Sequence, residues 1–142
     1  MNKCRKLKLI KNYTPCMTIE DEEIYRNGIF NFNISRILED INTGKLEVER
    51  EDINTIDWYR MHFHGLTDKE HLSKVDITKP VIQAEIRPGR YEIIDGNHRL
   101  EKAYRDNIET INSYKLNGEQ LVKYFIDTRG YEAFVEYWNS KL

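Results

Sequence analysis

The residues best suited to chemistry lie in one run, Asp95-Gly96-Asn97-His98-Arg99. Gly96 has no Cβ, so the backbone can turn sharply there and come close to a ligand. The residues after Gly96 are expected to begin a helix. The free N–H groups and the positive dipole of a helix start favour an anion, above all phosphate. The run therefore predicts a phosphate-binding turn.

Three side chains of the run extend this chemistry. Arg99 supplies a permanent cation with a planar donor fork that suits phosphate oxygens. His98 can donate to a phosphate or transfer a proton near neutral pH. Asp95 can orient His98, bind a magnesium ion or cap the following helix. Asp95, His98 and Arg99 are therefore the candidate catalytic residues, and Asp95 is the candidate metal ligand.

A purely structural interpretation fits the same residues. Asp-Gly-Asn is a common sequence where a strand turns into a helix, for backbone reasons alone. Asp95 would then cap the helix, Gly96 and Asn97 would accept a left-handed backbone, and Arg99 would be a solvated helix residue. The residue types leave both interpretations open.

The flanking sequence predicts the elements that position this run. Two strands are expected at residues 81–86 and 91–95, joined by the Pro-Gly turn in "RPGR". A helix is expected from about 98 to 105, followed by a third strand in "TINSYKL". The order strand, turn, strand, DGNHR, helix, strand predicts a mixed α+β fold.

The rest of the chain is predicted to surround this centre. Residues 1–17 are interpreted as an arm and residues 18–142 as a single domain, with a core at about 46–117 and C-terminal helices in 118–142. Thr18 and the acids after it predict a helix that ends at Gly28. Further elements are expected as an extended stretch at 30–34, a helix from Ser35 to Gly44, a strand at 45–53, helical turns after residue 55, a helix from Thr67, and closing helices at 119–126 and 131–138.

The stretch "YEIIDGNHRLEKAYRDN", residues 91–107, resembles the phosphate-loop box of the ParB/sulfiredoxin superfamily. The resemblance continues upstream through "LTDKEHLSKVDITKPVIQAEI" and downstream to "ETINSYKL", and covers about residues 46–117. It implies a ParB/sulfiredoxin-like fold, a small mixed sheet flanked by helices. It also implies that Gly96, Asn97, His98 and Arg99 bind the phosphates of ATP or another nucleoside triphosphate, with Mg²⁺.

The chain departs from the best-known members of that superfamily in two ways. Sulfiredoxins carry a catalytic cysteine directly before the His-Arg pair, where this chain has Asn97. Partitioning ParB proteins carry a helix-turn-helix DNA-binding domain after the nucleotide module, where only residues 118–142 remain here. The resemblance therefore favours a nucleotide-binding protein, and it leaves open whether this protein is an enzyme. If it is one, we expect an ATP-dependent phosphotransferase or a nucleotide hydrolase. Two alternatives stay open: a phage or mobile-element module that binds a protein or nucleic acid, and a metal-dependent nuclease.

Composition and charge limit the possible partners. The chain has 142 residues, 39% hydrophobic and 32% charged, with a net charge of −2. This charge does not predict a basic surface for wrapping duplex DNA. No apolar run approaches the length of a membrane span, and the basic N-terminus lacks the apolar segment of a secretory signal. Cys4 and Cys16 fit free thiols, so we expect a cytoplasmic protein without a membrane partner.

Other candidate residues give weaker signals. His62, His64 and His71 could contribute to a metal site, but they lack a well-spaced further ligand. A general base could come from Asp76 or from the acidic run at 47–52, in which a solvated strand face is the alternative interpretation. The aromatic residues of 131–138 favour a helix packed on the core over a nucleic-acid stacking platform, because few cations lie among them.

Overall fold

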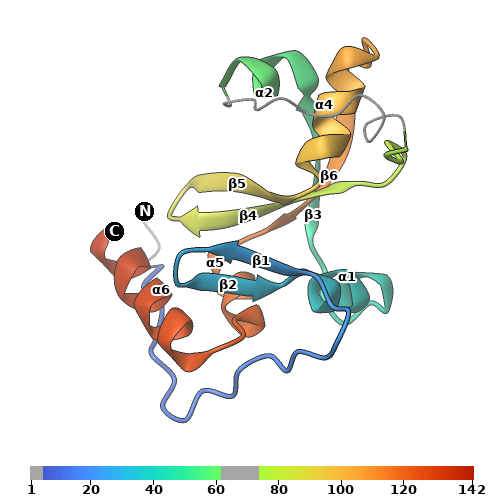
Figure 1. Cartoon of the computed structure of the whole chain (residues 1–142). Coiled ribbons are helices and arrows are strands. Elements are labelled where there is room, and N and C mark those ends of the chain that lie inside the picture. Colours follow the sequence, from blue (N-terminus) through green and yellow to red (C-terminus); the bar gives the residue numbers. More distant parts are fainter. Residues whose placement is uncertain (1–4, 62–73) are drawn as a thin grey trace. The chain divides into compact units, whose positions relative to one another are not determined.

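The computed structural model describes residues 5–61 and 74–142 (Figure 1). Helices and small sheets alternate along this part of the chain, which confirms the predicted α+β class. The chain divides into two compact units. Among the described residues, the first unit draws on 5–48, 84–92 and 116–142, and the second on 49–61, 74–83 and 93–115.

The first unit opens with a β-hairpin. Strands β1 (Ile24–Asn27) and β2 (Phe30–Asn33) pair antiparallel across a two-residue turn. Gly28 takes the first central position of this turn with a φ of 61°, a conformation that favours glycine over other residues. The helix predicted from Thr18 to Gly28 is therefore wrong, whereas the extended stretch predicted after it is confirmed.

Four helical segments occur in the described part of the first unit. Helix α1 (Ile34–Asn42) starts at its N-cap Asn33, whose side chain accepts a hydrogen bond from the backbone N–H of Arg36 at 3.0 Å. The predicted closing helices are present with different bounds, as α5 (Gly118–Leu121), the 3₁₀ turn η1 (Val122–Tyr124) and α6 (Thr128–Ser140).

The core of the first unit is aromatic. Tyr131, Phe134 and Trp138 lie on one face of α6 and are at most 1% exposed. The ring of Phe125 packs edge-on against Phe32 of β2, with 4.7 Å between the ring centroids. The prediction that the last helix packs its aromatic residues on the core is therefore confirmed.

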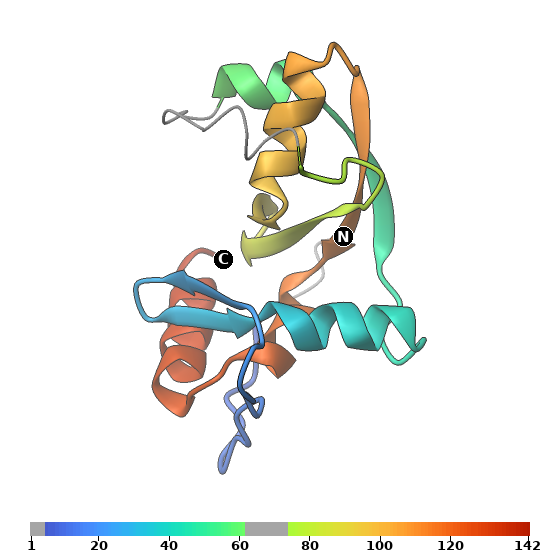
Figure 2. The same ribbon diagram turned by 45° about the vertical axis from the view of Figure 1, so that its right-hand side comes forward.

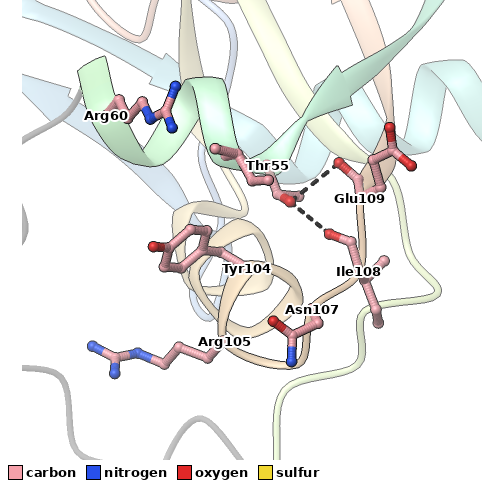
Figure 3. A pocket seen from close by; sticks show the side chains of 8 residues that line it. Thr55, Arg60, Tyr104, Arg105, Asn107, Ile108 and Glu109 are labelled. Atoms are coloured by element: carbon pink, nitrogen blue, oxygen red, sulfur yellow. Dashed lines mark hydrogen bonds between the residues drawn. The ribbon is translucent and has the colours of Figure 1, made fainter.

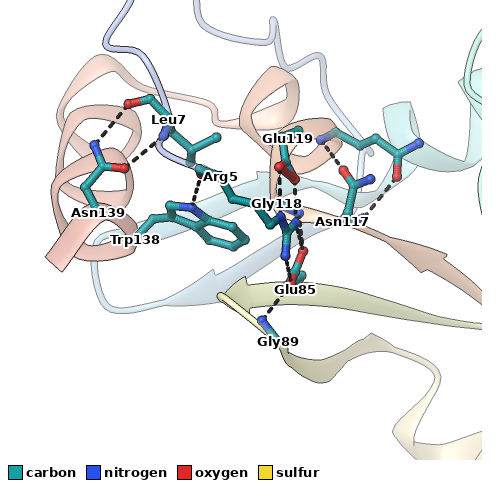
Figure 4. A network of polar contacts seen from close by, with 10 residues as sticks. Arg5, Leu7, Glu85, Gly89, Asn117, Gly118, Glu119, Trp138 and Asn139 are labelled. Atoms are coloured by element: carbon teal, nitrogen blue, oxygen red, sulfur yellow. Dashed lines mark hydrogen bonds and ion pairs between the residues drawn. The ribbon is translucent and has the colours of Figure 1, made fainter. Parts of the chain in front are cut away.

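Residues 5–17 form no helix or strand and run along α6. Leu7 exchanges two hydrogen bonds with the side chain of Asn139, at 2.9 and 3.0 Å (Figure 4). The Tyr13 ring stacks on Tyr131 with 3.7 Å between centroids. Side-chain contacts rather than a strand ladder thus hold this segment on the first unit.

A partly buried ion pair between Arg5 and Glu85 anchors the start of this segment (Figure 4). Glu85 is 1% exposed, and its two oxygens accept hydrogen bonds from the Arg5 guanidinium at 2.6 and 2.7 Å. The backbone N–H groups of Gly89 and Gly118 also donate to this carboxylate, at 2.8 and 3.0 Å. Burial by itself raises the pKa of Glu85, but the donors from Arg5, Gly118 and Gly89 together hold that pKa below its usual range.

This ion pair predicts a pH-dependent stability. Because the pKa of Glu85 is lower in the folded chain than in the unfolded chain, its contribution is complete above about pH 4.3 and is lost as the pH falls further. We expect Glu85→Gln to flatten the acid side of a plot of unfolding free energy against pH, measured with urea from pH 3 to 7. Glu119→Gln is the control, because Glu119 binds the same arginine but is 45% exposed. Equal slopes for wild type and Glu85→Gln would contradict this account.

A four-stranded sheet is covered by two helices (Figure 2). Residues 84–92 and Leu116 of this part of the chain belong to the first unit, and the rest belongs to the second. The strands follow the order β3-β6-β4-β5, and β3 runs antiparallel to β6. The predicted Pro88-Gly89 turn joins β4 to β5. The elements are β3 (Glu49–Asn54), α2 (Thr55–Met61), β4 (Val81–Arg87), β5 (Arg90–Asp95), α4 (Asn97–Arg105) and β6 (Thr110–Leu116).

The core of the second unit fixes α4 against the sheet. Leu100 and Ala103 of α4 are fully buried and pack with Trp58 of α2, Val81 of β4 and Ile111 of β6. The apolar residues of α4 therefore face the sheet. The first turn of this helix lies at the end of β5. The predicted helix from Thr67 and the candidate ligands His62, His64 and His71 lie outside the described residues.

Candidate functional site

The run 95–99 forms the junction between β5 and α4. Asp95 is the last residue of β5, and Gly96 is the N-cap of α4 with a φ of 100° and a ψ of 19°. Helix α4 begins at Asn97, one residue before the predicted start. Gly96 has no side chain and therefore makes no side-chain cap hydrogen bond at this helix start. The interpretation of Asp95 as the helix cap is therefore wrong.

Gly96 packs tightly on the core. A Cβ added there would lie 2.5 Å from Cγ1 and 2.9 Å from Cβ of Val81, which is fully buried. Such distances are shorter than packed carbon atoms allow. The left-handed backbone at position 96 and the close approach of Val81 therefore both require a glycine, whether or not a ligand binds.

Arg99 is a partly buried residue that ties the helix start to the chain before β4. Its Nη1 donates a hydrogen bond to the carbonyl oxygen of Pro80 at 2.8 Å. The same atom lies 3.6 Å from Oδ2 of Asp95, and the Arg99 side chain is 21% exposed. The interpretation of Arg99 as a solvated helix residue is therefore wrong. Its guanidinium is held in place beside the junction.

Asp95 carries an unusual buried oxygen. The side chain is 10% exposed, and Oδ2 accepts no hydrogen bond from any residue in 5–61 or 74–142. Buried carboxylate oxygens normally have hydrogen-bond donors, because an unmet acceptor costs free energy. The ion pair with Arg99 offsets part of that cost. Oδ2 can therefore still contact a cation or accept a hydrogen bond from a ligand.

Asn97 and His98 occupy the exposed part of the first turn of α4. Two cations further along the helix hold residues 75–80 beside it: Arg99 through Pro80, and Lys102, whose Nζ donates to the carbonyl oxygen of Val75 at 3.0 Å. The structure therefore brings Asp95, Arg99 and the exposed side chains of Asn97 and His98 to one helix end.

Asp76 lies in the segment that these cations hold. Its Oδ1 accepts hydrogen bonds from the hydroxyl and the backbone N–H of Thr78, at 2.5 and 2.9 Å. These bonds hold the pKa of Asp76 below its usual range. A carboxylate with a lowered pKa is a weak base, so the geometry does not favour Asp76 as a general base.

The acidic run at 47–52 forms a solvated strand face. Residues 49–52 of β3 are exposed. Glu51 pairs with Lys115 at 3.0 Å, and Asp52 accepts a hydrogen bond from Asn112 at 2.9 Å. Glu47 precedes β3 and is not part of this strand. Acidic residues of this run therefore pair with side chains of the neighbouring strand β6.

No group of three or more His, Cys, Asp or Glu side chains with metal-binding geometry occurs in the part of the chain that the structure describes. Asp95 would therefore hold Mg²⁺ only together with ligand oxygens. Magnesium commonly binds in this way, through one or two carboxylates and substrate phosphates.

One feature of the second unit has no signal in the sequence. A pocket lies at the C-terminal end of α4, lined by residues from α2, from the last turn of α4 and from the chain leading into β6 (Figure 3). Its residues are spread over two separate segments, 55–60 and 104–109, and form no motif.

No protein-family model, curated protein or solved structure matches this chain. Within residues 5–61 and 74–142, no helix combines the length and the apolar character that a bilayer crossing requires.

Proposed function

We propose that this protein binds a nucleoside triphosphate, with its phosphates at the first turn of α4, on a ParB/sulfiredoxin-like fold in the cytoplasm. The observation that carries the proposal is the junction at Gly96. There a nine-residue helix begins at a glycine N-cap, next to a buried Asp95 oxygen that accepts no hydrogen bond from residues 5–61 or 74–142. Helix starts of this kind bind phosphate through their backbone N–H groups and dipole.

The side chains around the junction support an anionic ligand with a bound cation. The hydrogen bond to Pro80 fixes the Arg99 guanidinium, so little rotamer freedom is lost when it meets a phosphate. Asn97 and His98 are exposed and can add hydrogen bonds. Asp95 is the residue that would hold Mg²⁺ beside the phosphates, and the ion would neutralise phosphate charge when bound.

An enzymatic role would be phosphoryl transfer or nucleotide hydrolysis. In such reactions the protein contributes mainly positioning and charge stabilisation. Arg99 would stabilise negative charge on the phosphates, and His98 would donate to the transferred group. Asp95 would fix the orientation of Arg99 through their ion pair.

Nucleotide binding is expected to depend on the first turn of α4. With Mg²⁺ and ATP at 100 times the dissociation constant, the free energy of unfolding should rise by about 2.7 kcal/mol. Arg99→Ala should weaken ATP binding about tenfold or more, because it removes a charged hydrogen-bond donor. His98→Ala should weaken binding without loss of fold, since His98 is exposed. Isothermal titration calorimetry measures both effects.

Arg129→Ala is the matched control, because Arg129 is an exposed arginine of the first unit. Its affinity for ATP should equal that of the wild type. If ATP, GTP, CTP and UTP with Mg²⁺ all fail to bind, the proposal is wrong and the interaction-module alternative is favoured. If ATP binds equally to the wild type, Arg99→Ala and His98→Ala, the phosphate site lies elsewhere.

A further inference from the structure

The pocket lies at the C-terminal end of α4 (Figure 3), whereas the proposed phosphate site lies at the first turn of that helix. Its volume is about 610 Å³, within the usual range of small-molecule sites. All of its residues belong to the second unit. They are Thr55, Ile56, Arg60, Tyr104, Arg105, Asn107, Ile108 and Glu109.

Hydrogen bonds fix the two walls of the pocket to one another. The Thr55 hydroxyl contacts the carbonyl oxygens of Ile108 and Glu109, at 2.5 and 3.1 Å (Figure 3). The Thr55 backbone N–H also donates to the Glu109 carbonyl, at 2.9 Å. On the other side, Tyr104 stacks on Tyr59 with 3.9 Å between ring centroids. The pocket is therefore formed before a ligand arrives.

The backbone carbonyl oxygens at the C-terminal end of α4 already accept hydrogen bonds within the chain. The carbonyl oxygens of Lys102, Ala103 and Tyr104 accept hydrogen bonds from the N–H groups of residues 106–108, at 2.8 to 3.1 Å. Asn107 makes this possible with a φ of 60°. A ligand in this pocket would therefore make its polar contacts with side chains.

Charge and apolar surface are combined in this pocket. Arg105 pairs with Glu101 at 3.1 Å. The side chain of Arg60 forms no hydrogen bond or ion pair with another residue of the described chain, and Arg60 is exposed. Ile56 is 44% exposed and supplies an apolar wall. Glu109 adds an exposed carboxylate that can accept a hydrogen bond.

We propose that this pocket binds a small planar organic anion. The anionic head, a carboxylate or a phosphate, contacts Arg60, because a guanidinium binds both groups through paired donors. The flat body lies along Tyr104 and Ile56, and Glu109 accepts a hydrogen bond from a donor on the ligand. This second site does not depend on the proposed nucleotide site.

The test uses the whole chain and three probes: benzoate, phenyl phosphate and uncharged benzamide. Backbone amide shifts in the NMR spectrum report where each probe binds. We expect both anions, or one of them, to shift the amides of residues 55–56 and 107–109, and to bind at least about tenfold more tightly than benzamide. The tighter anion identifies the head group.

Arg60→Ala should weaken binding of the anions by about tenfold or more, through loss of a charged donor. Arg60 has no partner in the described chain whose loss would disturb the fold. Arg129→Ala and His98→Ala should leave the affinity for the probes unchanged. The proposal is overturned if no anion shifts these amides, if benzamide binds as well as the anions, or if Arg60→Ala binds like the wild type.

Discussion

Gly96→Ala should lower the free energy of unfolding by about 2–4 kcal/mol and abolish nucleotide binding. The left-handed φ of 100° costs an alanine about 1 kcal/mol. Overpacking adds about 1–3 kcal/mol, because the new Cβ would lie 2.5 Å from Cγ1 of the fully buried Val81. Urea unfolding measures the loss.

Gly89→Ala is the matched control for this substitution. Gly89 also has a positive φ, of 79°, but a Cβ there would meet no atom within 4 Å. It should therefore lose only the backbone contribution, about 1 kcal/mol. If Gly96→Ala and Gly89→Ala lose the same free energy, the close packing of Gly96 on Val81 is not as described.

Gly118→Ala should lower the free energy of unfolding by about 3 kcal/mol. A Cβ at this position would lie 2.3 and 2.5 Å from two ring atoms of Trp138, which is fully buried. The ring is held in place, since its Nε1 donates to the Arg5 carbonyl oxygen at 2.8 Å. The indole therefore has little room to move, and overpacking of this kind typically costs about 1–3 kcal/mol or more.

A double-mutant cycle with Trp138→Phe tests the cause of this loss. The phenyl ring lacks the indole atoms that crowd position 118, so the two substitutions together should cost less than the sum of each alone. Additive losses measured by urea unfolding would show that the indole is not the obstacle. Glu119→Ala, at an exposed neighbouring position, should cost far less.

The central part of the fold was predictable because its signals are local. The Pro-Gly turn, the alternating residues around it and the apolar spacing of α4 each act within a few residues. The N-terminal part was predicted wrongly for a physical reason. Acids after Thr18 are typical of a helix start, but the turn at Gly28 and the stacking of Tyr25 on Phe32, at 5.5 Å, stabilise a hairpin instead.

The details of the site could not be predicted, because they depend on contacts between distant segments. Arg99 and Pro80 are 19 residues apart in the sequence, and Arg5 and Glu85 are 80 residues apart. The residue types at 95–99 therefore predicted the junction at Gly96, but they did not predict that Val81 packs against it. The pocket at the end of α4 escaped prediction for the same reason.

These distant contacts also decide which substitutions are informative. Gly96 and Arg99 have structural roles, so their replacement changes stability as well as binding. His98 is exposed, and its replacement separates the two effects better. A loss of nucleotide affinity in His98→Ala with unchanged stability would distinguish a functional junction from a purely structural one.

A titration with ATP and Mg²⁺, followed through backbone amide shifts of the whole chain, tests the central claim most directly. The account predicts saturable shifts that are largest at residues 96–99, the first turn of α4. The absence of shifts at these residues would contradict it, as would saturable shifts confined to another part of the chain, such as residues 55–60 and 104–109.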